Sequence, residues 1–331
     1  MIITRTPFRM SFFGGGTDFS GFYNEHGGAV LSTTFDKYCY VTVRHLPRFF
    51  EYKTHLTYSK EEKVNSYEEI KHPAIRNAME WLDMHELRLV YDSDLPARTG
   101  LGTSSSFAVG MLEAFYALKG KYADKRKLAD DAIHLERVLC AEAGGIQDQI
   151  AASFGGLNRI DFSQDGYTVN PIIISPERKK ALNDNLMLFF TGISRFSSDV
   201  QKKTEKSMKD KTQELLKMYD LVDKAEQVLV TKDADLDDFG RLLDYTWQLK
   251  RGISSGISSD SIDDQYNAAM KAGALGGKLL GAGGGGFLLF YVPKEKQEAV
   301  RAALKDQLHV PFQFENEGTK IVFYQAEEFE D

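Results

Sequence analysis

The amino-acid sequence predicts an α+β protein that is divided into two domains. The chain has 331 residues, which is more than one typical domain requires, so two hydrophobic cores are the first expectation. Runs with strand composition occur in both halves and are interspersed with stretches of helical periodicity. A polar stretch, residues 175–185, separates the strand-like runs 168–174 and 186–190. We place the domain boundary there, with residues 1–182 in the first domain and 183–331 in the second.

The composition is that of an ordinary globular protein, and it excludes several functional classes. A net charge of −7 argues against nucleic acid or an anionic membrane as the main partner. The two cysteines, Cys39 and Cys140, are too few for a disulfide framework or a metal cluster. The N-terminus lacks the apolar core of a signal peptide, and no apolar run approaches the roughly 18 residues of a membrane span. We therefore expect a cytoplasmic monomer or homodimer that acts on small molecules.

The first domain begins with an extended segment that ends in the triple glycine 14–16. Glycines at the end of a strand indicate that the backbone approaches something closely. Asp18 follows them and is either an acceptor for ligand hydroxyl groups or a cap of the next turn. In this half, strands are predicted over residues 2–5, 7–13, 27–31, 39–43 and 87–91, and a helix over 75–82.

The most informative stretch is the loop 95–106, which contains two glycines and four consecutive hydroxyl residues. It leads into a helix whose apolar spacing begins at Phe107. The first-turn amides and the dipole of such a helix attract anions, and glycine lets a phosphate come close. The serine hydroxyls suit phosphate or a hard cation, although the run is also compatible with an ordinary helix cap. Arg98, in the same loop, either contacts the substrate or nucleotide or is solvated.

A carboxylate interrupts the apolar face of the helix predicted over residues 124–142. Glu136 lies on the same face as Ile133. A buried carboxylate must find a partner, which is either a cation or an arginine such as Arg137 or Arg9.

A second carboxylate, Asp148, follows the glycine turn 144–145 and opens another helix. That position suits either an N-cap or a catalytic carboxylate.

The second domain is predicted to contain long charged helices over residues 197–230 and 235–250, whose lysines and glutamates we expect to face solvent. Arg195 directly follows a strand and a glycine, and is a candidate for holding an anionic group of the substrate.

The glycine-rich stretch 276–286 contains the pattern G-x-G-x-x-G, but its context excludes a dinucleotide-binding motif. That motif needs a strand before it and a helix after it, whereas a helix over 262–272 precedes this stretch and a strand over 287–292 follows it. The P-loop pattern G-x-x-x-x-G-K-[S/T] is also absent from the sequence. The glycines therefore require a close approach to a ligand or to the other domain. A helix over 294–307 and a strand over 320–324 are predicted to complete an α+β second domain.

Three glycine-bearing stretches in this order, residues 7–18, 96–106 and 278–286, resemble the three signature motifs of the GHMP kinases. This superfamily includes galactokinase, homoserine kinase and mevalonate kinase, and the resemblance covers essentially the whole chain. It implies an ATP-dependent phosphotransferase with an active site between two domains. The first would be like the second domain of ribosomal protein S5, and the second would be ferredoxin-like.

The resemblance also implies roles for individual residues. The loop of residues 100–106, called the serine loop below, would wrap the phosphates of ATP. Ser104 would bind Mg²⁺ together with Glu136. Asp148 stands in Gly-Ile-Gln-Asp-Gln, which is similar to the galactokinase run Gly-Ile-Met-Asp-Gln, where the aspartate faces the hydroxyl to be phosphorylated. Arg9 matches the basic residue that faces the transferring phosphoryl group. The expected site comprises Arg9 and Asp148 for catalysis; Gly100, Leu101, Gly102, Thr103, Ser104, Ser105 and Ser106 for the ATP phosphates; Thr17, Asp18, Arg195, Gly283 and Gly284 for the substrate; and Ser104 and Glu136 for the metal.

The first motif points to a particular branch of the family. Its triple glycine 14–16 replaces the Gly-Glu-His of galactokinases, which argues against galactose. Phe-Gly-Gly-Gly-Thr-Asp together with Thr-Gly-Leu-Gly-Thr-Ser-Ser-Ser resembles the branch that contains the D-glycero-D-manno-heptose 7-phosphate kinases. These phosphorylate the anomeric C1 hydroxyl on the way to a nucleotide-activated heptose. The alternatives are a 1-kinase for L-fucose or another hexose, which would need no second anion site near Arg98 or Arg195, and a non-catalytic sugar or nucleotide sensor.

Overall fold

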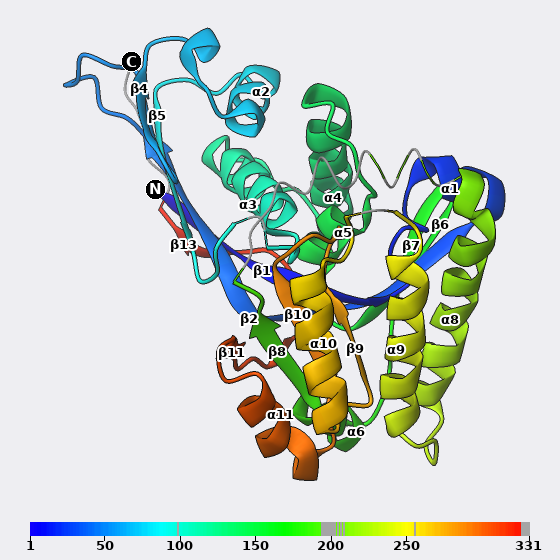
Figure 1. The fold of residues 1–331 in the computed structure, drawn as a ribbon. Coiled ribbons are helices and arrows are strands. Elements are labelled where there is room, and N and C mark those ends of the chain that lie inside the picture. The colour runs from blue at the N-terminus through cyan, green and yellow to red at the C-terminus, as the bar shows by residue number, and fades with distance from the viewer. Residues whose placement is uncertain are drawn as a thin grey trace.

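The molecule consists of two mainly antiparallel sheets and the helices that cover them (Figure 1). Both sheets contribute residues to a shared hydrophobic core. In Figure 1, α3, α4 and α5 lie on one side of the long β1–β2 ribbon, and the second sheet with α8, α9 and α10 lies on the other. The computed structural model describes residues 1–97, 99–192, 203, 205, 207, 209–254 and 256–325.

The first sheet is organised by two long strands, β1 (Ile2–Phe13) and β2 (Gly28–His45), which pair from Ile2↔Val43 to Phe13↔Leu31. The separate strands predicted over 27–31 and 39–43 are thus one strand of 18 residues. The sheet order is β13-β1-β2-β5-β3-β4, with β6 and β12 also paired to β2. The remaining strands of this half are β3 (Thr54–Thr57), β4 (Glu61–Val64), β5 (Leu87–Ser93), β6 (Asn158–Ser163) and β7 (Gly166–Pro171).

The central helix α3 (Thr103–Leu118) packs directly on β1 and β2 and is buried on almost every side. Gly110 permits this contact, because a Cβ atom there would lie 2.5 Å from Thr6 Oγ1 on β1. The middle of α3 is therefore held close to the strand that carries Arg9. The other helices of the first half are α1 (Ser20–His26), α2 (Pro73–Trp81), α4 (Lys125–Ile133), α5 (Gln147–Phe154) and α6 (Pro176–Asp184), with a 3-10 turn, η1 (Tyr67–Glu69).

The helix predicted over residues 124–142 is shorter and less regular than expected. After α4 the backbone continues as a π-helical turn, η2 (His134–Leu139), and Ala141 has a positive φ of 51°. Single π-helical turns often occur at functional sites. Here the turn carries the buried Glu136.

The second sheet has the order β11-β8-β10-β9. Its central strand β10 (Phe287–Tyr291) is buried along its whole length, as its uninterrupted apolar run predicts. The polar stretch 175–185, chosen as the domain boundary, is largely the helix α6. The remaining elements are β8 (Leu186–Phe190), η3 (Lys209–Lys211), α8 (Thr212–Val230), α9 (Asp237–Arg251), α10 (Asp260–Ala272), β9 (Gly276–Leu279), η4 (Lys294–Lys296), α11 (Gln297–Ala303) and β11 (Leu308–Val310).

A helix was expected from the sequence directly before the glycine-rich loop, and this expectation is wrong. A strand, β9, lies between the preceding helix and the glycine loop, and it pairs antiparallel with β10. The loop is therefore the turn of a hairpin. The dinucleotide-binding motif remains excluded, because a strand and not a helix follows the glycines.

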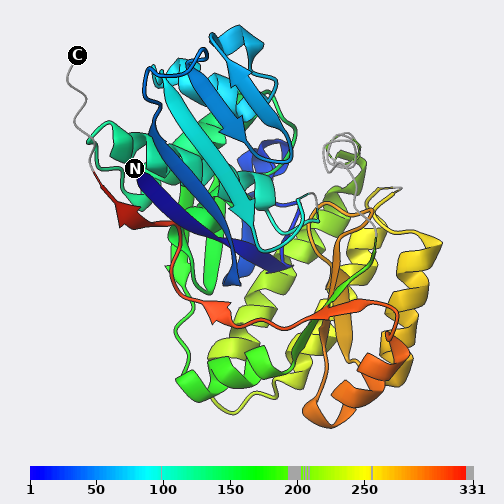
Figure 2. The ribbon, with the colours of Figure 1, turned by 90° about the vertical axis from the view of Figure 1, so that its left-hand side faces the viewer.

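The last strand belongs to the first sheet and not, as predicted, to the second. The strand β13 (Lys320–Tyr324) pairs with β1, and β12 (Phe314–Glu315) pairs with β2. Figure 2 shows this strand beside the N-terminus. The division at residues 182 and 183 stays a prediction, and the chain crosses back over it at its end.

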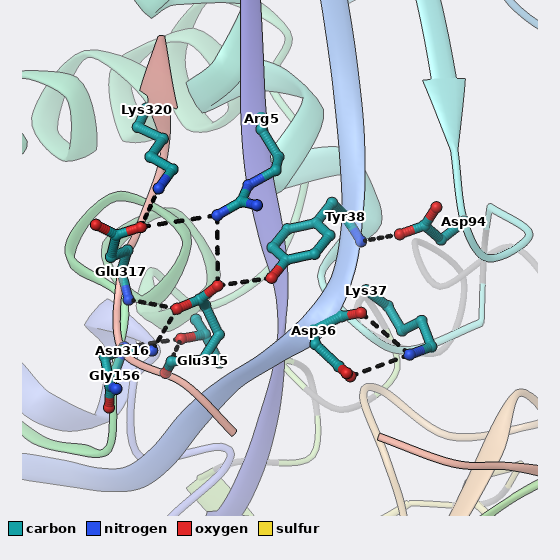
Figure 3. Close-up of polar contacts among 11 residues, drawn as sticks. Arg5, Asp36, Lys37, Tyr38, Asp94, Gly156, Glu315, Asn316, Glu317 and Lys320 are labelled. Atoms are coloured by element: carbon teal, nitrogen blue, oxygen red, sulfur yellow. Dashed lines mark hydrogen bonds and ion pairs between the residues drawn. The ribbon is translucent and has the colours of Figure 1, made fainter. Parts of the chain in front are cut away.

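Polar contacts fix this returning segment to the first sheet (Figure 3). The guanidinium group of Arg5 lies 4.2 Å from the ring centre of Tyr38 and 3.5 Å from Glu315 Oε2. The hydroxyl group of Tyr38 donates to the same carboxylate at 2.6 Å. Residues from β1, β2 and β12 are thus joined in one network.

An apolar core joins the two halves of the molecule. Phe12 and Phe13 of β1 each contact the ring of Phe239 in α9 edge to face, at centroid distances of 5.3 and 5.1 Å. Residues of α8 and β10 complete this cluster. Within the described part of the chain, no helix is long and apolar enough to cross a membrane.

Candidate active site

The serine loop, residues 100–106, adopts the backbone that its glycines predict. Gly100 and Gly102 have φ values of +81° and +72°, which glycine adopts far more readily than other residues. The N–H of Ser106 makes the first bond within α3, to Gly102 O at 2.9 Å, and its hydroxyl donates to Pro7 O at 2.9 Å. The amides before Ser106 therefore surround the positive end of the helix, where an anion is favoured.

Glu136 is buried directly beneath this loop. Its carboxylate accepts hydrogen bonds from Ser104 Oγ at 3.1 Å, from Ser105 Oγ at 2.7 Å and from the amide of Gln149. Arg137, one of the partners considered from the sequence, lies at 3.9 Å, the outer limit of an ion pair. Neighbouring hydroxyl and carboxylate oxygens are the ligands that Mg²⁺ prefers.

The donor set fits Mg²⁺ better than a transition metal. Among the described residues, no group of three or more His, Cys, Asp or Glu side chains is placed to hold a metal. Magnesium is usually held by one or two carboxylates, with water and substrate phosphates completing its shell. Glu136 and Ser104 match this requirement.

Arg9 and Asp148 form a bidentate ion pair. Arg9 Nε and Nη2 donate to the two oxygens of Asp148 at 2.7 and 2.8 Å, and Nη1 donates to Gly100 O at 2.7 Å. The pair touches the serine loop, because a Cβ atom at Gly102 would lie 3.2 Å from Arg9 Cγ and 3.5 Å from Asp148 Cγ. The two residues neutralise each other, and each oxygen of Asp148 keeps a lone pair for a further donor.

Asp18 is buried close to this pair. Its carboxylate accepts from the backbone N–H groups of Gly16 at 3.0 Å and Gln147 at 3.3 Å. Burial, and secondly the charge of Asp148, raise the pKa of Asp18. Gly145 leaves room for it, since a Cβ atom there would lie 1.8 Å from Asp18 Oδ2. This carboxylate is suited to accept hydrogen bonds from ligand hydroxyl groups.

Glycines of the stretch 276–286 contact the serine loop and the residue before it. A Cβ atom at Gly100 would lie 2.3 Å from Leu280 O, and one at Gly281 would lie 2.3 Å from Gly100 Cα. A Cβ atom at Gly286 would lie 2.1 Å from Thr99 O. Of the two explanations that the sequence left open, contact with the other domain therefore accounts for these glycines.

The structure does not bring every expected residue to one place. Thr17 is buried, and its hydroxyl donates to two main-chain carbonyl groups at 2.8 and 2.9 Å, so it supports the loop. Gly283 and Gly284 contact the backbone of residue 257. Arg98 and Arg195 lie outside the described residues.

Two lysines that the sequence analysis did not assign to the site lie at its edge. Lys250, at the end of α9, was expected to face solvent but is buried, and its ammonium group donates to Gly281 O. Lys278 of β9 is also buried and donates to Phe12 O at 2.8 Å. Burial lowers the pKa of Lys250 to about 8, with a contribution from Arg9, and lowers the pKa of Lys278 well below its usual value.

A cleft of about 680 Å³, measured with its open mouth, brings these groups together. Arg9 and Asp148 line it and also contact the serine loop, so they stand between the cleft and the expected phosphate site. The charged side chains that line the cleft are Arg9, Asp18, Asp148, Lys250 and Lys278.

Comparison with known proteins identifies the family. The model of the GHMP kinases N-terminal domain matches residues 68–156, and that of the GHMP kinases C-terminal domain matches residues 225–310. A D-glycero-alpha-D-manno-heptose 7-phosphate kinase of Campylobacter jejuni is 30% identical over 337 residues, which cover 96% of this chain and 98% of that protein. The chain belongs to the GHMP kinases. This GHMP kinase is a sugar kinase, and therefore an ATP-dependent phosphotransferase.

Two further similarities were found, one to a curated protein and one to a solved structure. An L-fucokinase/L-fucose-1-P guanylyltransferase of Bacteroides fragilis is 30% identical over 219 residues, which cover 62% of the GHMP kinase described here and 22% of that protein. The crystal structure of a D-glycero-D-manno-heptose 1-phosphate kinase from Bacteroides thetaiotaomicron superimposes with a TM-score of 0.80 at 23% identity, covering 98% of this chain and 100% of that one. The predicted two-domain GHMP kinase fold is confirmed.

Proposed function

We propose that this GHMP kinase transfers the γ-phosphoryl group of ATP to the anomeric C1 hydroxyl of D-glycero-D-manno-heptose 7-phosphate, giving the 1,7-bisphosphate. The observation that carries the proposal is the position of the Arg9–Asp148 pair, which touches the serine loop on one side and lines a charged cleft on the other. The similarity to the heptose 7-phosphate kinase of Campylobacter jejuni supports the choice of sugar.

The serine loop is the binding site for the phosphates of ATP in this proposal. Ser104 is an exposed residue whose hydroxyl contacts Glu136, whereas the hydroxyl of the buried Ser106 is engaged by Pro7 O. Ser104 and Glu136 would hold Mg²⁺, which supplies neutralisation of the phosphate charge when it is bound. Glu136 is kept in place for this by Ser105 and Gln149.

Asp148 accepts the proton of the C1 hydroxyl, and Arg9 orients Asp148. The guanidinium occupies one lone pair on each carboxylate oxygen and leaves the others for the substrate. An anomeric hydroxyl is more acidic than an ordinary alcohol, so a carboxylate is an adequate acceptor. Most of the rate enhancement comes from positioning and charge neutralisation, because the transition state of phosphoryl transfer is loose. Asp18 accepts hydrogen bonds from other hydroxyl groups of the sugar.

A 1-kinase for L-fucose or another hexose is the second candidate, and the similarity to the fucokinase of Bacteroides fragilis favours it. It shares the chemistry at C1 and differs in the absence of a phosphate on the acceptor. A non-catalytic sensor, the third alternative, is set aside because the chain is a sugar kinase by family.

A panel of acceptors tests the proposal. D-glycero-D-manno-heptose 7-phosphate, the same heptose without phosphate, L-fucose and galactose are each incubated with MgATP, and ADP release is measured. Phosphorus NMR then identifies the phosphorylated carbon. We expect kcat/KM to be highest for the heptose 7-phosphate, with an anomeric phosphate as product. Higher kcat/KM for an unphosphorylated sugar, or phosphorylation at another carbon, contradicts the proposal.

A further inference from the structure

Two buried lysines line the cleft, and within the described residues neither has a carboxylate partner. Lys250 and Lys278 are 8% and 1% exposed. Their hydrogen bonds are to main-chain carbonyl groups, those of Leu279 and Gly281 for Lys250 and that of Phe12 for Lys278. Neither forms an ion pair with any residue in the described part of the chain. An ammonium group has three N–H donors, and burying its charge without an anion is costly.

A third unsatisfied donor lies in the same cleft. Ser11 is 5% exposed and lines the cleft, and its hydroxyl has no hydrogen-bond partner among the residues that the structure describes. Buried hydroxyl groups are nearly always hydrogen-bonded, so an orphan that faces a cleft points to a ligand.

The strand β1 orders these groups along the cleft. Its residues Pro7 and Arg9 contact the serine loop, through Ser106 Oγ and Leu101 O, and its residue Phe12 holds Lys278. Two strand residues span about 6.6 Å, and alternate side chains share a face. Ser11 and Lys278 therefore lie beyond Arg9, on the side away from the expected phosphates of ATP.

With both lysines protonated, the charged side chains that line the cleft carry a net positive charge. Arg9 and Asp148 neutralise each other through their two hydrogen bonds. The two lysines then face a single remaining carboxylate, Asp18, when both are protonated. An anion is the ligand that such an arrangement favours.

We propose that Lys250, Lys278 and Ser11 form a subsite for a phosphate group carried by the acceptor sugar. The inference rests on the proposed function and deepens it, because it names the residues that would select a phosphorylated over an unphosphorylated sugar. A sugar whose C1 hydroxyl reaches Asp148 extends along β1, and its distal phosphate meets the three donors. Arg98 and Arg195, considered from the sequence for this role, lie outside the described residues.

Binding at this subsite is coupled to protonation. Burial and Arg9 lower the pKa of Lys250, whereas Asp18 and Asp148 raise it, and the result is about 8. Burial, Lys250 and Arg9 lower the pKa of Lys278 further. A bound dianion favours the charged amines and raises both values. Phosphate binding therefore takes up protons, and its affinity falls as the pH rises through about 8.

Steady-state kinetics of three variants provide the first test. Lys250→Met, Lys278→Met and Ser11→Ala are compared with Arg241→Gln, which alters an exposed cation on the same helix as Lys250. For a lysine variant we expect KM for the sugar phosphate to rise about 10- to 100-fold, the range of a lost hydrogen bond to a charged group. We expect kcat to stay within about threefold, with KM for unphosphorylated sugars and the behaviour of Arg241→Gln unchanged.

Calorimetry gives a readout that does not depend on activity. Inorganic phosphate is titrated into the enzyme at pH 8.5 with a non-hydrolysable ATP analogue filling the serine loop, in two buffers of different ionisation enthalpy. We expect binding with proton uptake in the wild type, and weaker binding with less uptake in Lys250→Met and Lys278→Met. Melting temperatures show whether each variant is folded, and Ser11→Ala tests the subsite without altering a buried charge.

The outcomes separate this inference from the proposed function. An equal fall of kcat for both kinds of acceptor would place the lysines on the transferred phosphoryl group and overturn the subsite. Unchanged KM values and unchanged phosphate binding in all three variants would also overturn it. If the wild type rejects every sugar phosphate, the proposed function fails, and calorimetry alone decides whether the subsite exists: absence of phosphate binding refutes it.

Discussion

Asp148→Asn tests both the ion pair that Asp148 forms with Arg9 and the catalytic role that we propose for it. The change removes the negative charge opposite Arg9, whose side chain is 5% exposed, and turns an amide N–H₂ toward guanidinium N–H groups. Breaking a buried ion pair by removing one partner costs about 3–5 kcal/mol. Asp148 is itself 22% exposed, so we expect the free energy of unfolding to fall by about 3 kcal/mol in chemical denaturation.

The same substitution removes the group that we propose as the proton acceptor. A positioned general base contributes about 10²- to 10⁴-fold, so kcat should fall within that range at saturating ATP and sugar. Asp238→Asn is the matched control, because Asp238 pairs with Arg241 on the exposed surface of α9. It should change stability by less than about 1 kcal/mol and leave kcat unaltered. If folded Asp148→Asn retains kcat within about threefold of the wild type, Asp148 is not the proton acceptor.

Three further predictions concern the metal site, the buried amine and the glycine contact. Glu136→Gln should raise the Mg²⁺ concentration needed for half-maximal rate by at least about tenfold, measured by magnesium titration at fixed ATP; an unchanged requirement would place the metal elsewhere. The pKa of Lys278 is lower in the folded than in the unfolded protein, so the folded state binds fewer protons. The wild type should therefore become more stable relative to Lys278→Met as the pH rises toward the unfolded pKa near 10.5. A pH-independent difference in melting temperature between the two proteins would refute this. Gly100→Ala should destabilise far more than Gly120→Ala in thermal melts, since both have positive φ but only Gly100 has another backbone atom, Leu280 O, within 2.3 Å of the added Cβ; equal losses would mean that the contact does not matter.

The burial of Glu136 was predictable from the sequence, and the burial of Lys250 could have been predicted in the same way, from a charged residue on an apolar helix face. Glu136 was found because it interrupts an apolar face. Lys250 continues the buried stripe that contains Leu243 and Trp247, at spacings of seven and three residues. It was missed because lysines in a charged helix were assigned to the solvated face. A charge at the end of a buried stripe is the signal that would have found it.

The strand β13 shows what local patterns leave open. The sequence predicted a strand over 320–324, and β13 has these bounds. A strand pattern specifies which side chains share a face but not which strand lies alongside, and here the partner, β1, is more than 300 residues away. The same holds for the glycines of residues 280–286, which predicted a close contact without naming Gly100 as the partner.

The segment around Glu136 shows that hydrophobic periodicity alone does not predict the exact geometry of a helix. Residues 124–142 fit a helical repeat of 3.6, but the structure replaces the last turns by the π-helical segment His134–Leu139 and a residue with positive φ. Periodicity averages over a window and does not resolve one inserted residue. Glu136 nevertheless faces inward, because the change of winding starts only two residues before it.

The return of β13 to β1 has a consequence for biosynthesis. While the ribosome is still making the second half, the outer edge of Ile2–Arg5 has no neighbour, and an open edge can pair with the strands of other nascent chains. The sheet that carries Arg9 is finished only when β12 and β13 emerge. A premature stop before residue 320 would therefore damage the sheet that contains β1, even though the missing strand lies more than 300 residues further along the chain.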